Sequence, residues 1–179
     1  MIRKAVWQDL DAIDRIYQEI HDAEEAGTMT IGWIRNVYPT RETASAALER
    51  DDIYVLEENG VILGSAIINQ FQMESYQCAP WEHPVPDDQV CVLHTLVISP
   101  LENGKGYGRT FLSFYEEYAR QHRLPELRLD TNARNTGARA MYRRHGYREV
   151  GTVPTVFNGI PDVQLVLLEK QIILNKQET

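Results

Sequence analysis

The spacing of apolar residues changes several times along the chain, and each change marks an expected element. Residues 1–6 alternate as in a short strand, and from Gln8 apolar residues recur every three or four positions, as on one helix face, until Gly27. The pattern predicts a short second helix within 28–38, which Pro39 bars from continuing. A further helix is expected over 40–48, with Thr40 as its N-cap.

The second part of the chain is richer in strand patterns. Residues 90–98 are almost all apolar or β-branched, which predicts a central strand buried on both faces. Asn59-Gly60 predicts a hairpin turn. Further strands are expected over 53–57, 61–71, 127–131, 147–153 and 163–168, and helices over 106–121 and 135–145. The order β-α-α-β-β-β-α-β-α-β-β predicts one mixed α/β domain spanning residues 1–179.

Composition narrows the class of protein. The chain has 179 residues, 43% of them hydrophobic and 25% charged, which is typical of a globular domain and excludes a disordered chain. No apolar run reaches the roughly 18 residues of a membrane span, and no apolar segment follows the basic N-terminus, so we expect no membrane partner, no signal peptide and a cytoplasmic location. The net charge of −8 argues against nucleic acid and permits a cationic substrate.

The cysteines and histidines give no metal signature in the sequence. Cys78 and Cys91 are too few for a disulfide framework, and both are expected to stay reduced. His83 and His145 lack partners at metal-ligand spacing, so the sequence predicts no metal.

The strongest chemical signal is a glycine-rich turn, 103–109, between the buried strand and the helix that follows it. Glycines at alternate positions allow a sharp turn that brings backbone N–H groups close to a ligand, and a helix N-terminus favours an anion such as a pyrophosphate. The spacing fits neither the P-loop nor the dinucleotide-binding pattern. Glycine spacing alone leaves open a plain strand-to-helix connection.

A second motif makes the interpretation of this turn more specific. The Asn103-to-Gly108 turn resembles the acetyl-CoA motif of the GCN5-related N-acetyltransferase superfamily, although Asn103 stands where Gln or Arg is usual. Asn135, Tyr142 and Gly146-Tyr147 are similar to the family's second signature, with Tyr147 in place of Phe. The resemblance implies a single-domain α/β fold with a central, mixed, mostly antiparallel twisted sheet of about six to seven strands, flanked by helices and splayed at the cofactor site.

The resemblance also implies which residues of this chain bind the cofactor. Backbone groups of one strand would hold the pantetheine arm of acetyl-CoA, the glycine turn would hold the pyrophosphate, and the second motif would complete the site. These residues are Leu96, Val97, Ile98, Asn103, Gly104, Lys105, Gly106, Tyr107, Gly108, Arg109, Asn135 and Tyr142.

Two residues are the catalytic candidates. Tyr142 matches the tyrosine that protonates the leaving thiolate, with a plain core tyrosine as the alternative. Some relatives carry a histidine at the position of His94, on a strand often bulged there, so we expect His94 to deprotonate the amine; a buried structural histidine is the alternative.

The expected activity is transfer of an acetyl group from acetyl-CoA to a primary amine of a small molecule, by direct attack through a tetrahedral intermediate. A protein or peptide amine as acceptor, and a non-catalytic CoA-binding regulatory domain, are the alternatives. Trp33, Tyr38, Tyr76 and Trp81 are candidates for an aromatic wall around the acceptor. An exposed edge of 163–168 is expected to pair across a homodimer.

Overall fold

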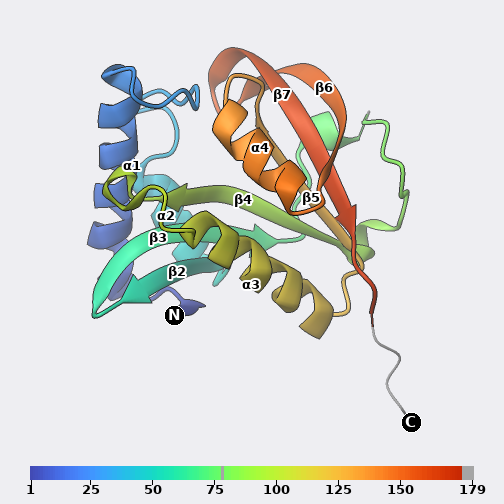
Figure 1. Cartoon of the computed structure of the whole chain (residues 1–179), viewed down its shortest axis with the longest axis horizontal. Coiled ribbons are helices and arrows are strands. Elements are labelled where there is room, and N and C mark those ends of the chain that lie inside the picture. Colours follow the sequence, from blue (N-terminus) through green and yellow to red (C-terminus); the bar gives the residue numbers. More distant parts are fainter. Residues whose placement is uncertain (78, 175–179) are drawn as a thin grey trace.

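The computed structural model describes residues 1–77 and 79–174, and in this part of the chain seven strands form one twisted sheet (Figure 1). The strand order is β1-β2-β3-β4-β5-β7-β6, and only β4 and β5 run parallel. The strands are β1 (Ile2–Lys4), β2 (Ile53–Glu58), β3 (Val61–Asn69), β4 (Val90–Ile98), β5 (Glu126–Asn132), β6 (Arg148–Phe157) and β7 (Ile160–Gln171). The predicted mixed, mostly antiparallel α/β sheet is confirmed.

Two pairs of helices cover opposite faces of this sheet. The helices are α1 (Leu10–Glu25), α2 (Arg41–Glu49), α3 (Tyr107–Gln121) and α4 (Thr136–Arg144). Alternation along β2 divides the core, because Ile53 and Val55 pack with α1 and α2, whereas Tyr54 and Leu56 pack with α3. The two motifs, which open α3 and α4, therefore lie on one side of the sheet (Figure 1).

The sheet opens between its two parallel strands. β4 and β5 are paired only from Val90↔Glu126 to Leu93↔Leu129. Beyond this point β4 continues along β3, while β5 continues along β7 as far as Asn132. The expected splay is confirmed, and it leaves the β5-facing backbone of residues 94–98 without a strand partner.

A bulge accompanies the splay. Thr95 has a φ of 47°, and the β3–β4 register shifts beside it, between Ser65 and Ile67. A bulge breaks the alternation of side chains along a strand and re-aims the residues around it. This is the expected bulge in the strand that carries His94.

The segment 28–38 corrects one expectation, because it forms a turn and not a helix. Ile34 and Tyr38 form an isolated β-bridge around Asn36, whose φ is 61°. At its start, the backbone N–H groups of Ile31 and Gly32 donate to the carboxylate of Glu24 (2.5 and 3.0 Å). These bonds to a side chain replace the backbone bonds of a helix, so tertiary contacts override the apolar spacing.

The C-terminal strands correct a second expectation. β7 lies between β5 and β6, so 163–168 is an interior segment and offers no free edge for pairing with a second copy. Asn158-Gly159 forms the tip of a long hairpin, with φ values of 47° and 86°, and both strands extend well beyond their predicted ends. Because β6 and β7 pair along the whole hairpin, residues whose sequence only weakly indicates a strand also adopt strand structure.

Cys91 is buried, and burial raises the pKa of its thiol to about 12, as expected for a packing residue. Cys78 lies outside the described residues. Within the described part of the chain, no helix has the length and apolar character that crossing a bilayer requires.

Candidate active site

The splay between β4 and β5 leads into a cavity of about 910 Å³. Its walls come from the free half of β4, the glycine turn, the end of β5 and the inner side of α4. The cavity reaches from the 28–38 turn to the first residues of α3, so it runs through the sheet from one side to the other. A volume of this size is at the upper end of the range for ligand sites.

The glycine turn forms one end of the cavity. Gly104 and Gly106 have φ values of 82° and 85°, and Gly106 is the N-cap of α3. A Cβ atom would meet nothing within 4 Å at either glycine, whereas at Gly108 it would lie 2.8 Å from the Met141 Sδ. These residues leave open space in front of the N–H groups that begin α3, and such a cradle fits a pyrophosphate.

Most of the predicted cofactor-binding residues lie together along this cavity. Its lining includes Leu96, Val97, Ile98, Asn103, Gly104, Gly106, Tyr107, Gly108, Arg109, Asn135 and Tyr142. Lys105 is the exception, because it is not part of the lining and its Nζ donates to the carboxylate of Glu102 at 2.6 Å. Arg109 is therefore the better placed of the two cations to face a phosphate.

The second motif builds the start and the inner face of α4. The Asn135 side chain caps the helix by accepting a hydrogen bond from the Ala138 N–H (3.1 Å). One face of α4 then brings the Tyr142 ring to the cavity. Burial, together with the nearby Asp130 carboxylate, raises the pKa of Tyr142, so its hydroxyl keeps its proton at neutral pH.

His94 lines the cavity from β4 and is held by a chain of hydrogen bonds. Asn69 Oδ1 already accepts the Phe71 N–H (2.9 Å), and it lies 3.0 Å from the His94 Nε2, so this nitrogen donates and Nδ1 stays unprotonated. The Asn69 amide in turn donates to Asp52 (2.9 Å). Burial lowers the pKa of His94 to about 4, so the imidazole is neutral and only weakly basic.

The structure adds an acid that the sequence analysis did not single out. Asp130 lies on β5 just beyond the last residue paired with β4, and it lines the cavity. Tyr76 donates its hydroxyl hydrogen bond to Asp130 Oδ2 (2.7 Å), and burial raises the pKa of Asp130 to about 6. Asp130 continues the alternation of 127–130 at a polar position, so the sequence pattern gave no signal that it faces a cavity.

Aromatic rings form the other end of the cavity. Trp33 and Tyr38, two of the four candidates for the aromatic wall, line it together with Phe157 from β6, and the Tyr38 ring stands edge-on to both neighbours (5.7 and 5.4 Å between centroids). The Tyr38 hydroxyl contacts Thr95 at the bulge. Among the described residues, the lining does not include Tyr76 or Trp81, which pack in the same hydrophobic cluster as Trp33, Tyr38 and Phe157.

Comparison with known proteins agrees with this architecture. The sequence profile of the acetyltransferase (GNAT) family matches residues 10–147. The chain belongs to this family. The family predicted from the glycine turn and the α4 motif is therefore confirmed.

Individual GNAT relatives extend the comparison. An uncharacterized N-acetyltransferase of Bacillus subtilis (strain 168), YhfO, is 31% identical over 97 residues, which cover 54% of this chain and 58% of that protein. A GNAT-family acetyltransferase from Streptococcus agalactiae 2603 is 25% identical, with a TM-score of 0.81 over 97% of this chain and 95% of that one. The fold is shared with yncA from Salmonella typhimurium, solved with its cofactor acetyl-CoA (20% identity, TM-score 0.70, 100% and 97% covered).

Proposed function

We propose that this GNAT protein transfers the acetyl group of acetyl-CoA to a primary amine of a small molecule, by direct attack of the amine on the thioester. The observation that carries the proposal is a single cavity with two chemically different ends. One end is a glycine cradle at a helix N-terminus, and the other combines aromatic rings with the partly buried acid Asp130. The first end suits a pyrophosphate and the second suits an ammonium group.

The cofactor would lie along the open half of β4. The N–H groups at the start of α3 would hold the pyrophosphate, with Arg109 beside them. Backbone groups of Leu96, Val97 and Ile98, which have no β5 partner, would pair with the amide groups of the pantetheine arm. This arrangement would bring the thioester to the centre of the cavity, between His94 and Tyr142.

Asp130 is the group we assign to the acceptor amine. Its carboxylate is ionised at neutral pH, faces the cavity beside the aromatic wall, and is held in place by the Tyr76 hydroxyl. It would attract the ammonium group and then accept the proton that the nitrogen must lose. His94, the base expected from the sequence, is neutral but less basic, so we assign it to orienting the amine or a water molecule.

Tyr142 would complete the reaction. As the nitrogen–carbon bond forms, charge develops on the carbonyl oxygen, and backbone N–H groups of the open half of β4 would receive it. When the carbon–sulfur bond breaks, the Tyr142 hydroxyl would give its proton to the thiolate and later regain one from solvent. No covalent enzyme intermediate is needed.

An assay of free thiol release tests the proposal. Purified protein, acetyl-CoA and pools of small primary amines should release CoA, while N-terminal and lysine-containing peptides should be poorer acceptors. Faster turnover with peptides would reassign the acceptor class. Binding of acetyl-CoA without turnover on any amine would support a regulatory CoA-binding domain, and no binding at all would overturn the assignment.

A further inference from the structure

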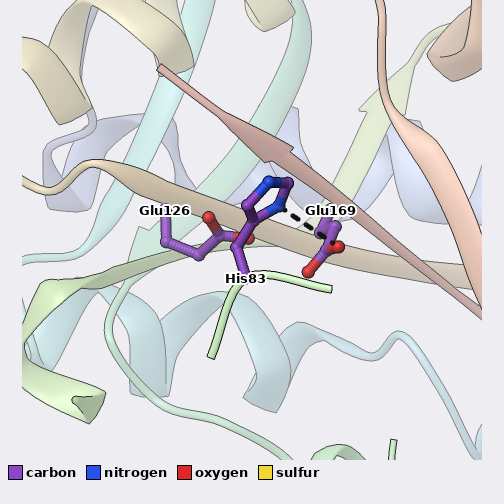
Figure 2. A group of neighbouring side chains, drawn as sticks. All are labelled: His83, Glu126 and Glu169. Carbon is purple, nitrogen blue, oxygen red and sulfur yellow. Dashed lines mark ion pairs between the residues drawn. The ribbon is translucent and has the colours of Figure 1, made fainter. Parts of the chain in front are cut away.

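A second cluster of titratable residues lies away from the cavity. It consists of His83 from the β3–β4 loop, Glu126 at the start of β5, and Glu169 near the end of β7. Figure 2 shows the two carboxylates on either side of the His83 ring. One ligand atom from each residue lies within 4.8 Å of the others, and none of the three lines the cavity.

The strand register explains why the two glutamates meet. Glu169 lies opposite Arg128 in the β5–β7 pair, so Glu126, two residues before Arg128, is its diagonal neighbour on the same face. Both side chains are 0% exposed, which is unusual for glutamate. The sheet therefore forces two carboxylates together inside the protein.

Three of the four carboxylate oxygens lack hydrogen-bond partners among the described residues. Among the described residues, neither oxygen of Glu126 has a hydrogen-bond partner, and the same holds for Glu169 Oε2 and for His83 Nδ1. A buried carboxylate is strongly destabilising unless a cation or hydrogen bonds compensate it. The two carboxylates together thus create a strong demand for positive charge.

The neighbouring arginine meets this demand only in part, because its charge acts on both glutamates while its hydrogen bonds go elsewhere. The Arg128 Nη1 donates to Gln72 Oε1 (2.5 Å), and Nη2 donates to the His83 carbonyl (3.4 Å). Its guanidinium also stacks over the Trp81 ring, 4.2 Å from the centroid. Arg128 thus donates to the β3–β4 loop through Nη1 and Nη2, whereas its Nε has no hydrogen-bond partner among the described residues, and none of the ion pairs there joins it to either glutamate.

We propose that His83, Glu126 and Glu169 bind a divalent transition-metal ion, Zn²⁺ in preference to a hard cation. One imidazole nitrogen with two carboxylate oxygens suits zinc, with water as the fourth ligand. Zinc bonds of about 2.0–2.1 Å place tetrahedral ligands about 3.4 Å apart. The His83 Nδ1 and the Glu169 Oε1 are 3.4 Å apart.

The surroundings support a structural role for the ion. The Glu82 N–H donates to Glu169 Oε1 (2.9 Å), which orients this carboxylate as outer partners of metal ligands do. The Glu82 side chain pairs with Arg148 of β6 (2.6 Å). An ion at this point would fasten the β3–β4 loop to β5 and β7, and the same loop supplies the Tyr76 that holds Asp130.

The zinc site is separate from the proposed chemistry. Glu126 and Asp130 are four residues apart on β5, which corresponds to about 13 Å along the strand. The inference therefore does not depend on the acetyltransferase proposal, and zinc binding is measured without substrate.

The test is a calorimetric titration of the full chain with Zn²⁺ after removal of metals with EDTA. We expect one equivalent to bind and the melting temperature to rise, because the ion binds only the folded arrangement. Glu126→Gln, which keeps the shape of the side chain, and His83→Asn, in the partly exposed loop, should each weaken binding by at least about tenfold. His122→Asn, at an exposed histidine after α3, is the matched control.

Each outcome decides the proposal. Stoichiometric binding that both variants weaken and His122→Asn retains would support it. Absence of zinc binding by the folded wild type would overturn it and leave a carboxyl pair that shares a proton. Zinc binding that Glu126→Gln and His83→Asn leave unchanged would also overturn it, because the ion would then bind elsewhere. Since His83 lies in a loop, its variant keeps the test valid if Glu126→Gln fails to fold.

Discussion

At the scale of single residues, three side chains of the cavity divide the proposed chemistry according to their pKa values. Burial acts on all three, but in different directions: it keeps Tyr142 protonated, raises the pKa of Asp130 to about 6, and lowers that of His94 to about 4. A proton donor and a base of nearly neutral pKa thus face one cavity. This separation of pKa values is what paired acid–base chemistry requires.

Replacing Tyr142 by Phe removes the proton donor and little else. We expect kcat to fall by about 10²-fold, within the range for a lost general acid, while acetyl-CoA binding is retained. Steady-state kinetics and calorimetry separate the two effects. Tyr147→Phe is the matched control, because Tyr147 is a buried tyrosine outside the cavity lining. Equal rates for the two variants would remove Tyr142 from the mechanism.

The pH profile distinguishes Asp130 from His94. Asp130 works as a base only when ionised, so kcat/KM of the wild type should fall about tenfold per pH unit below its pKa of about 6 and level off above it. Asp130→Asn should lower the rate and abolish this acid limb. His94→Gln should keep the limb, because the pKa of His94 lies near 4. Loss of the limb in His94→Gln alone would make the histidine the base.

At the scale of elements, the site depends on backbone geometry at two places. The bulge at Thr95 and the end of β4–β5 pairing free one side of β4, and the left-handed glycines Gly104 and Gly106 turn the chain into α3. Both features present unpaired backbone groups to one cavity. The proposed recognition of the cofactor by main-chain groups would explain why Asn103 can replace the family's usual Gln or Arg.

A bulky residue in the turn tests its role. Gly106→Trp should abolish acetyl-CoA binding in calorimetry, because the side chain would fill the open space in front of the α3 N-terminus. Gly60→Trp is the matched control: Gly60 also has a positive φ (76°) and open space, but it lies at the β2–β3 hairpin tip. Both variants carry similar backbone strain. Unchanged binding in folded Gly106→Trp would move the pyrophosphate elsewhere.

At the scale of the whole molecule, the sheet has two halves, and in the described part of the chain only the short β4–β5 pairing joins their strands directly (Figure 1). The cavity lies between these halves. β1 to β4 form one half, and β5 to β7 form the other. A ligand that fills the cavity would contact both halves and add to their connection. Ligand binding and the stability of the sheet should therefore be linked.

Hydrogen exchange with acetyl-CoA measures this link. At a concentration of about 100 times Kd, one-site binding adds about 2.7 kcal/mol to the free energy of unfolding. We expect slower exchange both in 94–98 of β4 and in 130–132 of β5, together with a higher melting temperature. The hairpin tip at Asn59-Gly60 serves as the internal reference. Protection confined to β4 would show that the ligand does not bridge the halves.

The sequence by itself determined the order of most elements, the glycine turn and the family, because these depend on local periodicity, on residues that tolerate unusual φ values, and on motifs of fixed spacing. It misjudged 28–38, where the Glu24 carboxylate outcompetes helical bonding, and the place of β7, since strand order is set by pairing between distant segments. Only the tertiary structure brought Asp130 and Phe157 to the cavity, and His83 to Glu126 and Glu169. The chemistry of these residues depends on burial and on contacts between residues far apart in the sequence, and the local spacing of residues predicts neither.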